Sequence, residues 1–300
     1  MSRTIAVGRS ALSSAKEAPP SEVTGRGETL LARYRRDPVS VIALTVIAAV
    51  LLLVVFAPLV APYDPFQVSL AEVRQPPSSR HVLGTDVAGF DVLSRVIFGG
   101  RVSLSVAAVA VLISVTVGAT LGLSSGYLGG WIDAVLQRFT EVFMSIPTLL
   151  LMITVAVAVG PSLVNAMVII GIFGWTTLSR LMRAQSLSLK QREFVISARA
   201  IGCTEPRIIF HYIFRNSLGP LTVNVIYGLR DAILAEASLS FLGIGVPPPT
   251  PSWGNMVTLA TQMTYLEAMP WVWIPPAIML IVVIIACSLV GDGLVRALRR

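Results

Sequence analysis

The sequence predicts an all-α polytopic membrane protein with six transmembrane helices and both termini in the cytoplasm. The first observation behind this fold class is composition: 54% of the 300 residues are hydrophobic and 13% are charged, whereas about a quarter of the residues in an ordinary soluble domain are charged. The second is that six segments are apolar enough to span a bilayer, which takes about 20 residues in a helix. The third is the distribution of the 23 basic residues along the chain.

The expected elements divide the chain into four parts. The first 38 residues are polar and contain no apolar run of the kind that begins a secretory signal, so they are interpreted as a cytoplasmic tail. Residues 39–61 form the first transmembrane helix, residues 62–101 an external segment, and residues 102–300 a core domain with five further helices. The six expected spans are Val39–Ala61, Val102–Ser125, Ala134–Val159, Leu163–Leu181, Leu218–Ile244 and Trp271–Val290.

The basic residues set the orientation, because Lys and Arg are retained on the cytoplasmic side of a membrane. With the N-terminus inside, 18 of the 23 fall on the cytoplasmic side: seven in the tail, one at Arg138, seven between Arg180 and Arg215, and three at the C-terminus. This orientation places residues 190–216 in the cytoplasm. It places the proline-rich loop that contains Trp253 outside, where backbone without a full set of hydrogen bonds is tolerated.

Four of the charged residues within the expected spans are candidates for functional charges: Glu141, Arg230, Asp231 and Glu236. A charge at the centre of a bilayer costs about 2.5–3.5 kcal/mol, so these side chains are expected to face a translocation path or to make polar contacts between helices. For Arg230 and Asp231, mutual or interhelical pairing is favoured over contact with a substrate. Glu236 is expected to matter more than Glu28 of the tail, since a buried carboxylate needs partners.

Residues 190–216 form a basic, half-amphipathic segment between apolar spans. Phe194, Ala198 and Ile201 recur at the spacing of one helical face, Gly202 ends that run, and Pro206 can begin a second short helix. The segment is therefore predicted to be two short helices around a glycine elbow. A helix of about nine residues is marginal in water, so something must hold it; a groove on a partner protein and the lipid headgroups are both open.

Several other kinds of site are disfavoured. His81 and His211 are far apart and lie in no HExxH spacing, and Cys203 and Cys287 form no CxxC pair, so no metal site is expected. The basic residues are not gathered on one water-facing surface, so no nucleic-acid partner is expected. The absence of a GxSxG or HExxH motif argues against an intramembrane hydrolase.

Nucleotide binding by this chain is also disfavoured. Its two lysines, Lys16 and Lys190, do not follow the GxxxxG pattern of a phosphate-binding loop. The glycine-rich stretch GYLGGWID (126–133) is better explained as a tight bend between two membrane helices.

Four longer motifs resemble a known family. These are GTDVAGFDVLSR (84–95), GYLGGWID (126–133), LAEASLSFLGIGVPPPTPSWGNM (234–256) and GDGLVRAL (291–298). Together with the glycine of the 190–216 segment, they are similar to the permeases of ABC importers, in particular the second (C-type) transmembrane subunit of the dipeptide/oligopeptide/nickel branch. The resemblance covers about residues 30 to 300. It departs at Ile196–Ala198, where the family usually has Glu-Ala-Ala.

This resemblance implies a type I ABC importer permease fold in a prokaryotic inner or plasma membrane. The chain would form half of a translocation path for peptides, with a homologous second permease, two cytoplasmic ATPases that bind ATP and Mg, and an external substrate-binding protein. It would itself carry no cofactor and no enzymatic activity. The alternatives are an autonomous secondary transporter or channel, and an ABC importer for nickel chelates or another small solute.

The resemblance also identifies residues 190–216 as the coupling loop, the cytoplasmic segment that docks on an ATPase. Within it, Ala198 is expected on the docking face, where only a small side chain fits, and Glu193 and Arg199 are expected to pair with the rim of the groove. The residues expected to couple to the ATPase are Glu193, Phe194, Ala198, Arg199, Gly202 and Arg207.

Overall fold

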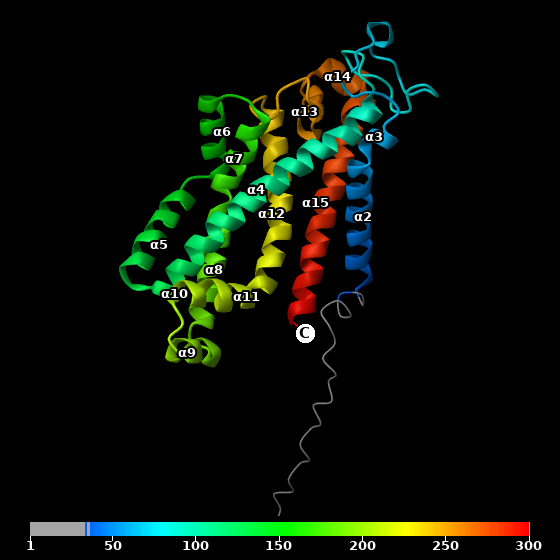
Figure 1. The fold of residues 1–300 in the computed structure, drawn as a ribbon. Coiled ribbons are helices and arrows are strands. Elements are labelled where there is room, and N and C mark those ends of the chain that lie inside the picture. Colours follow the sequence, from blue (N-terminus) through cyan, green and yellow to red (C-terminus); the bar gives the residue numbers. More distant parts are fainter. Residues whose placement is uncertain (1–33, 35–36, 300) are drawn as a thin grey trace, which may run out of the picture.

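The structure is a computed structural model that describes Tyr34 and residues 37–299. The described residues form helices and loops and no strand, apart from one isolated bridge between Thr85 and Asp91. The predicted cytoplasmic tail, residues 1–38, lies almost entirely outside the described residues. The described helices of eleven residues or more lie between two ends of the molecule (Figure 1). They are α2 (Pro38–Val55), α4 (Val92–Leu128), α5 (Gly130–Met144), α6 (Thr148–Val159), α7 (Leu163–Phe173), α8 (Trp175–Leu189), α12 (Leu218–Phe241) and α15 (Pro270–Arg299). Of these, α5, α6, α7 and α8 each cover only part of the length between the two ends.

Shorter helices occupy the two ends. One end carries α3 (Ala57–Val60), η1 (Leu70–Glu72), α13 (Trp253–Val257), η3 (Thr258–Thr261) and α14 (Met263–Ala268). The other end carries α9 (Glu193–Ala200), α10 (Glu205–Arg207), the π-helical η2 (Ile208–Ile213) and α11 (Phe214–Asn216). The start of α2 and the end of α15 lie at the same end as α9 (Figure 1).

By length and composition, four of the described helical segments can cross a membrane: α2, α4, the continuous segment Leu163–Leu189, and α15. The pair α5–α6 would make a fifth if it forms one broken span. The expected span Leu218–Ile244 corresponds to α12, which is about 36 Å long at 1.5 Å per residue but carries three charged residues. The predicted count of six spans therefore stays a prediction.

Helix α4 begins ten residues before the expected span, inside the segment predicted to be external. Its N-terminus is capped by Asp91, whose carboxylate accepts a hydrogen bond from the Ser94 amide at 2.8 Å. Farther along α4, the Arg101 guanidinium donates to the carbonyls of Val54 and Val55 at the end of α2, at 2.8 and 2.9 Å. The last carbonyls of a helix have no partner within that helix, so Arg101 satisfies these two. Arg95 also lies in α4, and its guanidinium donates to the Pro249 carbonyl at 3.2 Å. Two arginines of the segment predicted to be external therefore belong to a helix, and each has a backbone partner.

The prediction of one continuous helix over Ala134–Val159 is wrong, because this segment is two helices separated by a sharp bend. Helices α5 and α6 meet at an angle of 80° across the break that contains Pro147. Proline has no amide hydrogen to donate and disfavours helical geometry in the residue before it, so the chain turns here. The bend moves α5 away from α6 toward the end that carries α9 (Figure 1).

A stripe of glycines on α4 allows the closest helix contact in the core. A Cβ atom at Gly118, Gly122 or Gly126 would lie 2.3–2.8 Å from a backbone carbonyl oxygen of α8. The four-residue spacing keeps all three on one face of α4, as in small-residue interfaces between membrane helices. These contacts fix α8 against α4, and α8 leads directly into residues 190–216.

The positions of residues 200 and 250 give a testable topology. Residue 200 ends α9 and residue 250 precedes α13, and these lie at opposite ends of the helices (Figure 1). Reporter fusions after residue 200 are expected to give a cytoplasmic signal, and fusions after residue 250 an external one, because 18 of the 23 basic residues fall in segments predicted to be cytoplasmic. A fusion after residue 160, in the α6–α7 turn, serves as a second external control. A cytoplasmic signal at residue 250 would contradict this topology.

Candidate functional site

Residues 190–216, the predicted coupling loop, have the two-helix shape that the sequence predicts. Helix α9 ends in a Schellman motif, in which the Cys203 amide donates to the Ala198 carbonyl and the Gly202 amide donates to the Arg199 carbonyl, each at 3.0 Å. Gly202 adopts a φ of +81°, a left-handed angle that glycine reaches without steric cost. Pro206 lies in the first turn of α10, where its missing amide hydrogen costs nothing. The elbow at Gly202 is therefore confirmed as a structural feature.

The buried face of α9 differs from the predicted stripe. Val195 and Ala198 are the buried residues, packed in a cluster with Tyr127 of α4 and Ile208 of η2. Phe194 and Ile201 point outward, with 37% and 77% of their surfaces exposed. The expectation that Ala198 lies on an exposed docking face is therefore wrong, because this small side chain fills a gap inside the chain's own core.

The charged residues of the loop lie on its outer surface. Glu193 and Arg207 are exposed. Arg199 donates to the Tyr127 hydroxyl at 3.2 Å, and this hydrogen bond raises the pKa of the Arg199 guanidinium above its ordinary value. The exposed apolar side chains Phe194, Ile201 and Phe210 accompany these charges, which gives the loop a mixed surface suited to docking.

The burial of Ala198 gives a second prediction. Ala198→Trp is expected to displace α9 from α4, because inserting a large side chain into a packed site costs about 1–3 kcal/mol or more. The neighbouring substitution Ala200→Trp should be tolerated, since Ala200 is exposed. Limited proteolysis of the detergent-solubilised chain measures the difference. Equal cleavage rates within residues 190–216 in both variants would contradict the packing described here.

Ionic contacts join the loop's supporting helices. Arg183 of α8 donates to both oxygens of the Asp133 carboxylate in α5, at 2.6 Å each. The same carboxylate accepts from the Ser125 hydroxyl of α4. Lys190, at the end of α8, donates to the Gly126 carbonyl at 3.1 Å. A bidentate pair is a strong, directional contact, so α4, α5 and α8 meet the coupling loop as one connected unit.

A cavity of about 680 Å³ lies among α4, α6, α7, α8, α12 and α15. Arg230 and Asp231 of α12 line it and pair with each other, with nitrogen–oxygen distances of 2.8 and 2.9 Å. Tyr227 also lines the cavity and donates to Asp292 of α15 at 2.5 Å. The mutual pairing favoured by the sequence is present, and the paired groups also face an open space.

Glu236 has a different environment from the pair. It is fully buried and accepts hydrogen bonds from the hydroxyls of Ser103 at 2.9 Å and Ser240 at 2.8 Å. Ser103 in turn accepts from the Trp253 amide at 3.2 Å, and Ser240 from the Val246 amide at 3.1 Å. Of the two alternatives that the sequence left open, Glu236 makes polar contacts between helices and does not line the cavity.

Glu141 and Trp253 have separate positions. Glu141 is exposed, pairs with Arg138 one turn earlier at 3.1 Å, and does not line the large cavity. Trp253 is fully buried, and its indole nitrogen donates to the Val96 carbonyl of α4 at 2.9 Å. Trp253 therefore anchors the predicted external loop to the helices.

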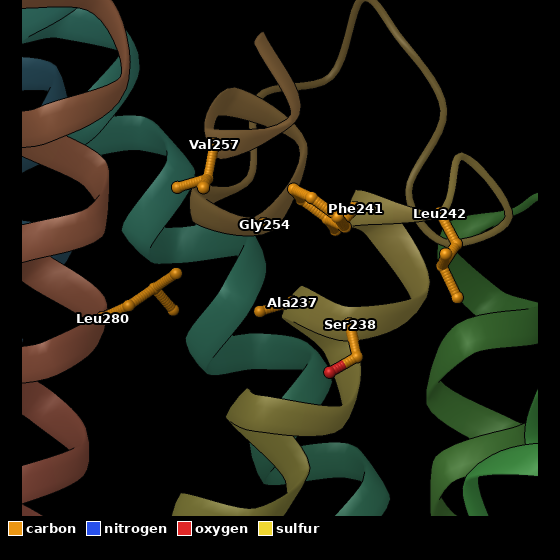
Figure 2. A pocket seen from close by; sticks show the side chains of 7 residues that line it. All are labelled: Ala237, Ser238, Phe241, Leu242, Gly254, Val257 and Leu280. Atoms are coloured by element: carbon orange, nitrogen blue, oxygen red, sulfur yellow. The ribbon is translucent and has the colours of Figure 1, made fainter. Parts of the chain in front are cut away.

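Helix α13 also borders a second pocket of about 340 Å³. Figure 2 shows its mostly apolar lining, with Leu280 of α15 on one side and Phe241 and Leu242 at the end of α12 on the other. Gly254 closes the gap between α13 and α12, because a Cβ at this position would lie 2.7 Å from the Cα of Ala237. The apolar lining makes this pocket a packing feature of the α12–α13 junction.

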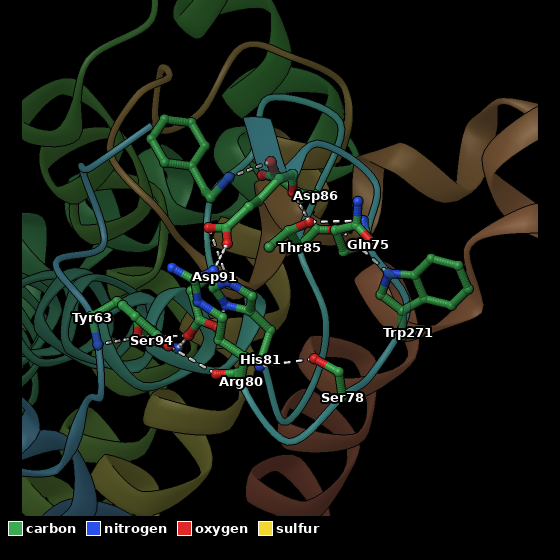
Figure 3. A network of polar contacts seen from close by, with 12 residues as sticks. Tyr63, Gln75, Ser78, Arg80, His81, Thr85, Asp86, Asp91, Ser94 and Trp271 are labelled. Carbon is green, nitrogen blue, oxygen red and sulfur yellow. Dashed lines mark hydrogen bonds and ion pairs between the residues drawn. The ribbon is translucent and has the colours of Figure 1, made fainter. Parts of the chain in front are cut away.

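Residues 62–95 contain a polar network that the sequence patterns did not predict (Figure 3). His81 is buried, with its Nδ1 2.9 Å from a carboxylate oxygen of Asp91 and its Nε2 3.4 Å from one of Glu72. The other Asp91 oxygen accepts from the Ser94 hydroxyl at 2.7 Å. Burial acts to raise the pKa of Glu72, but hydrogen bonds from His81 and Ser69 together with the Arg80 guanidinium hold it below its ordinary value. The motif GTDVAGFDVLSR contributes Asp91 and Ser94 and was the available signal.

Comparisons with known proteins agree with this architecture. Residues 118–300 match the family described as binding-protein-dependent transport system inner membrane component, and residues 28–77 match the N-terminal transmembrane domain of oligopeptide transport permease C. A peptide permease protein of Brucella suis is 36% identical over 262 residues, which is 87% of either chain. The dipeptide transport system permease protein DppC of Alkalihalophilus pseudofirmus is 36% identical over 89% of this chain and 87% of its own length.

A solved structure supports the fold independently. An inward-facing structure of the MetNI methionine ABC transporter matches with a TM-score of 0.55 at 18% identity, and the match covers 69% of this chain and 97% of that one. The arrangement of the matched helices is thus the type I ABC importer permease fold.

Proposed function

The chain belongs to the family of binding-protein-dependent transport system inner membrane components, the membrane-embedded permease subunits of ABC importers, and from this membership we propose that it imports peptides as the C-type subunit of a two-permease complex. In this proposal the chain forms half of the translocation path. A homologous permease forms the other half, two cytoplasmic ATPases drive the cycle, and an external binding protein delivers the cargo.

The observation that carries the proposal is the coupling loop. Its short helix α9 projects at one end of the molecule (Figure 1), is fixed by Val195 and Ala198 against the core, and exposes Phe194 and Ile201. A small helix with a rigid base and an exposed mixed surface suits a groove on a partner protein. The ion pair between Arg183 and Asp133 links α8, the helix that precedes the loop, to α5. A displacement of α9 would therefore be transmitted to the membrane helices.

Peptide cargo is supported by the names of two relatives, a peptide permease and a dipeptide permease. The cavity fits this class, because it combines apolar residues with the charged groups of Arg230, Asp231 and Asp292. Peptides carry both apolar side chains and charged termini. A lining that offers partial contacts to both kinds of group holds cargo weakly enough to release it.

ATP and Mg are assigned to the partner ATPases. This assignment is supported by Lys190, the one lysine in the described part of the chain, which follows no phosphate-binding loop and donates to the Gly126 carbonyl at 3.1 Å. What the chain supplies to the cycle is the docking surface and the path.

The test is reconstitution. The complex, purified with its second permease and ATPases in proteoliposomes, is mixed with its binding protein and a panel of dipeptides, oligopeptides and a nickel chelate. We expect peptides to stimulate ATP hydrolysis and to accumulate inside the vesicles. Accumulation without the ATPases would favour an autonomous transporter, and stimulation by the nickel chelate alone would replace the peptide assignment.

A further inference from the structure

We propose that Asp231 of α12 and Asp292 of α15 make the cavity of about 680 Å³ a charge filter, which favours the passage of cargo carrying a positive side chain over cargo carrying a negative one. The inference rests on the proposed function and deepens it, since it gives the permease, and not only the binding protein, a part in selectivity.

The depth of Asp231 is the first step. It lies 13 residues from the start of α12 at Leu218 and 10 from its end at Phe241, so it is about 15–20 Å from either end of the helix. Its side chain is nevertheless 63% exposed. A charge facing lipid at this depth is costly, and charged residues within membrane helices usually face a water-filled cavity. The exposed surface at Asp231 therefore belongs to an aqueous path.

The second step is the polar stripe around it. Asn224, Tyr227 and Asp231 follow each other on one face of α12, and Ser288 and Asp292 lie one turn apart on α15. All five line the same cavity. Polar residues from two helices thus meet at one space, whereas the remaining surface of α15 includes exposed Ile278, Ile281 and Ile285 suited to lipid.

The third step is the balance of charge. Arg230 is the only basic residue among the described residues that line the cavity, and Asp231 and Asp292 are its acidic residues. The guanidinium is already engaged: it pairs with Asp231, lies 3.5 Å from the Ser288 hydroxyl and lies 5.3 Å from the centre of the Tyr227 ring. Within the described part of the chain, only one oxygen of Asp231 and one of Asp292 accept hydrogen bonds from side chains.

The nearby Arg296 does not cancel the excess negative charge of the cavity. Arg296, one turn beyond Asp292 on α15, is paired with Asp37 across the interface with α2. The groups left free to meet cargo are therefore carboxylate oxygens, which attract an ammonium group and repel a carboxylate. Because the oxygens are partly solvated, the attraction is weak, and we expect a preference of about five-fold.

The experiment uses the reconstituted complex with two probe peptides, Ala-Lys-Ala and Ala-Glu-Ala, each at a concentration that saturates the binding protein. The measured quantity is the ratio of the two initial uptake rates. We expect the wild-type ratio to favour Ala-Lys-Ala by about five-fold, and Asp231→Asn and Asp292→Asn each to bring the ratio toward one. Glu267→Gln, which neutralises an exposed carboxylate on α14 outside the cavity, should keep the wild-type ratio.

The outcomes separate the two levels of inference. Uptake of both peptides with a wild-type ratio near one, or with a ratio that neither aspartate variant changes, overturns the charge filter and leaves the importer assignment intact. A wild-type complex that takes up neither peptide overturns the peptide assignment and the filter with it. Because the two aspartates are on different helices, either variant alone is sufficient if the other does not assemble.

Discussion

Gly202→Val is expected to lower peptide import by about ten-fold and to release the ATPases, while the membrane helices stay inserted and the partner permease stays bound. Gly202 holds a φ of +81° at the end of α9, where a residue with a Cβ pays about 1–2 kcal/mol and a β-branched residue fits least well. That cost corresponds to roughly a five- to thirty-fold change in an equilibrium. The chain would relieve this backbone strain by opening the Schellman motif, and the angle between α9 and α10 would then change.

Gly243→Val provides a matched control. Gly243 has a similar φ of +77° and lies at the other end of the molecule, after α12. A Cβ at either glycine would meet no atom within 4 Å, so both substitutions add backbone strain without a clash. A pull-down of the ATPases beside an uptake assay distinguishes the two variants. Normal ATPase recovery and normal uptake with Gly202→Val would show that the loop is not the coupling element.

The same assay addresses the lipid alternative. If the exposed Phe194 and Ile201 lie on lipid headgroups instead of in a groove, Ile201→Asp should weaken the loop's contact with the membrane and leave ATPase recovery unchanged. If they dock on an ATPase, the same substitution should reduce recovery, because a charge would enter an apolar part of the interface.

The features that the sequence predicted correctly are those with local causes. Gly202 and Pro206 mark the elbow of the coupling loop because backbone geometry is set by those residues themselves. The face of α9 was predicted incorrectly, since eight residues are too few for a period to be unambiguous. Whether Phe194 or Val195 is buried depends on Tyr127 and on η2, which the helix does not contain.

Features with distant causes were missed. The start of α4 was not predicted because residues 92–101 were placed in the external segment. The carbonyls that accept hydrogen bonds from Arg95 and Arg101 belong to Pro249 and Val54, 154 and 47 residues away. For the same reason the sequence could not separate Glu236 from Asp231. Both are carboxylates in one apolar helix. Glu236 is buried because it packs against α4, and Asp231 faces the cavity that α15 also lines.

Glu236→Leu is expected to destabilise the assembled complex by about 2–6 kcal/mol. The carboxylate is fully buried, and its two oxygens accept from Ser103 of α4 and from Ser240 of its own helix. Leucine would leave both hydroxyls without their acceptor, and each buried unsatisfied polar group costs about 1–3 kcal/mol. These hydroxyls also hold the amides of Trp253 and Val246, so the loss would loosen the loop before α13 as well.

Glu236→Gln separates hydrogen bonding from charge. Glutamine keeps one oxygen acceptor and the shape of the side chain, so this variant should lose less than half of the stability lost by leucine. Glu267→Leu on the exposed surface of α14 should be near neutral, as most surface substitutions are. The thermal midpoint of the detergent-solubilised complex, followed by size-exclusion chromatography after heating, gives the order of the three. A midpoint for Glu236→Leu equal to that of Glu267→Leu would mean that the hydrogen bonds of Glu236 do not hold α4, α12 and the external loop together.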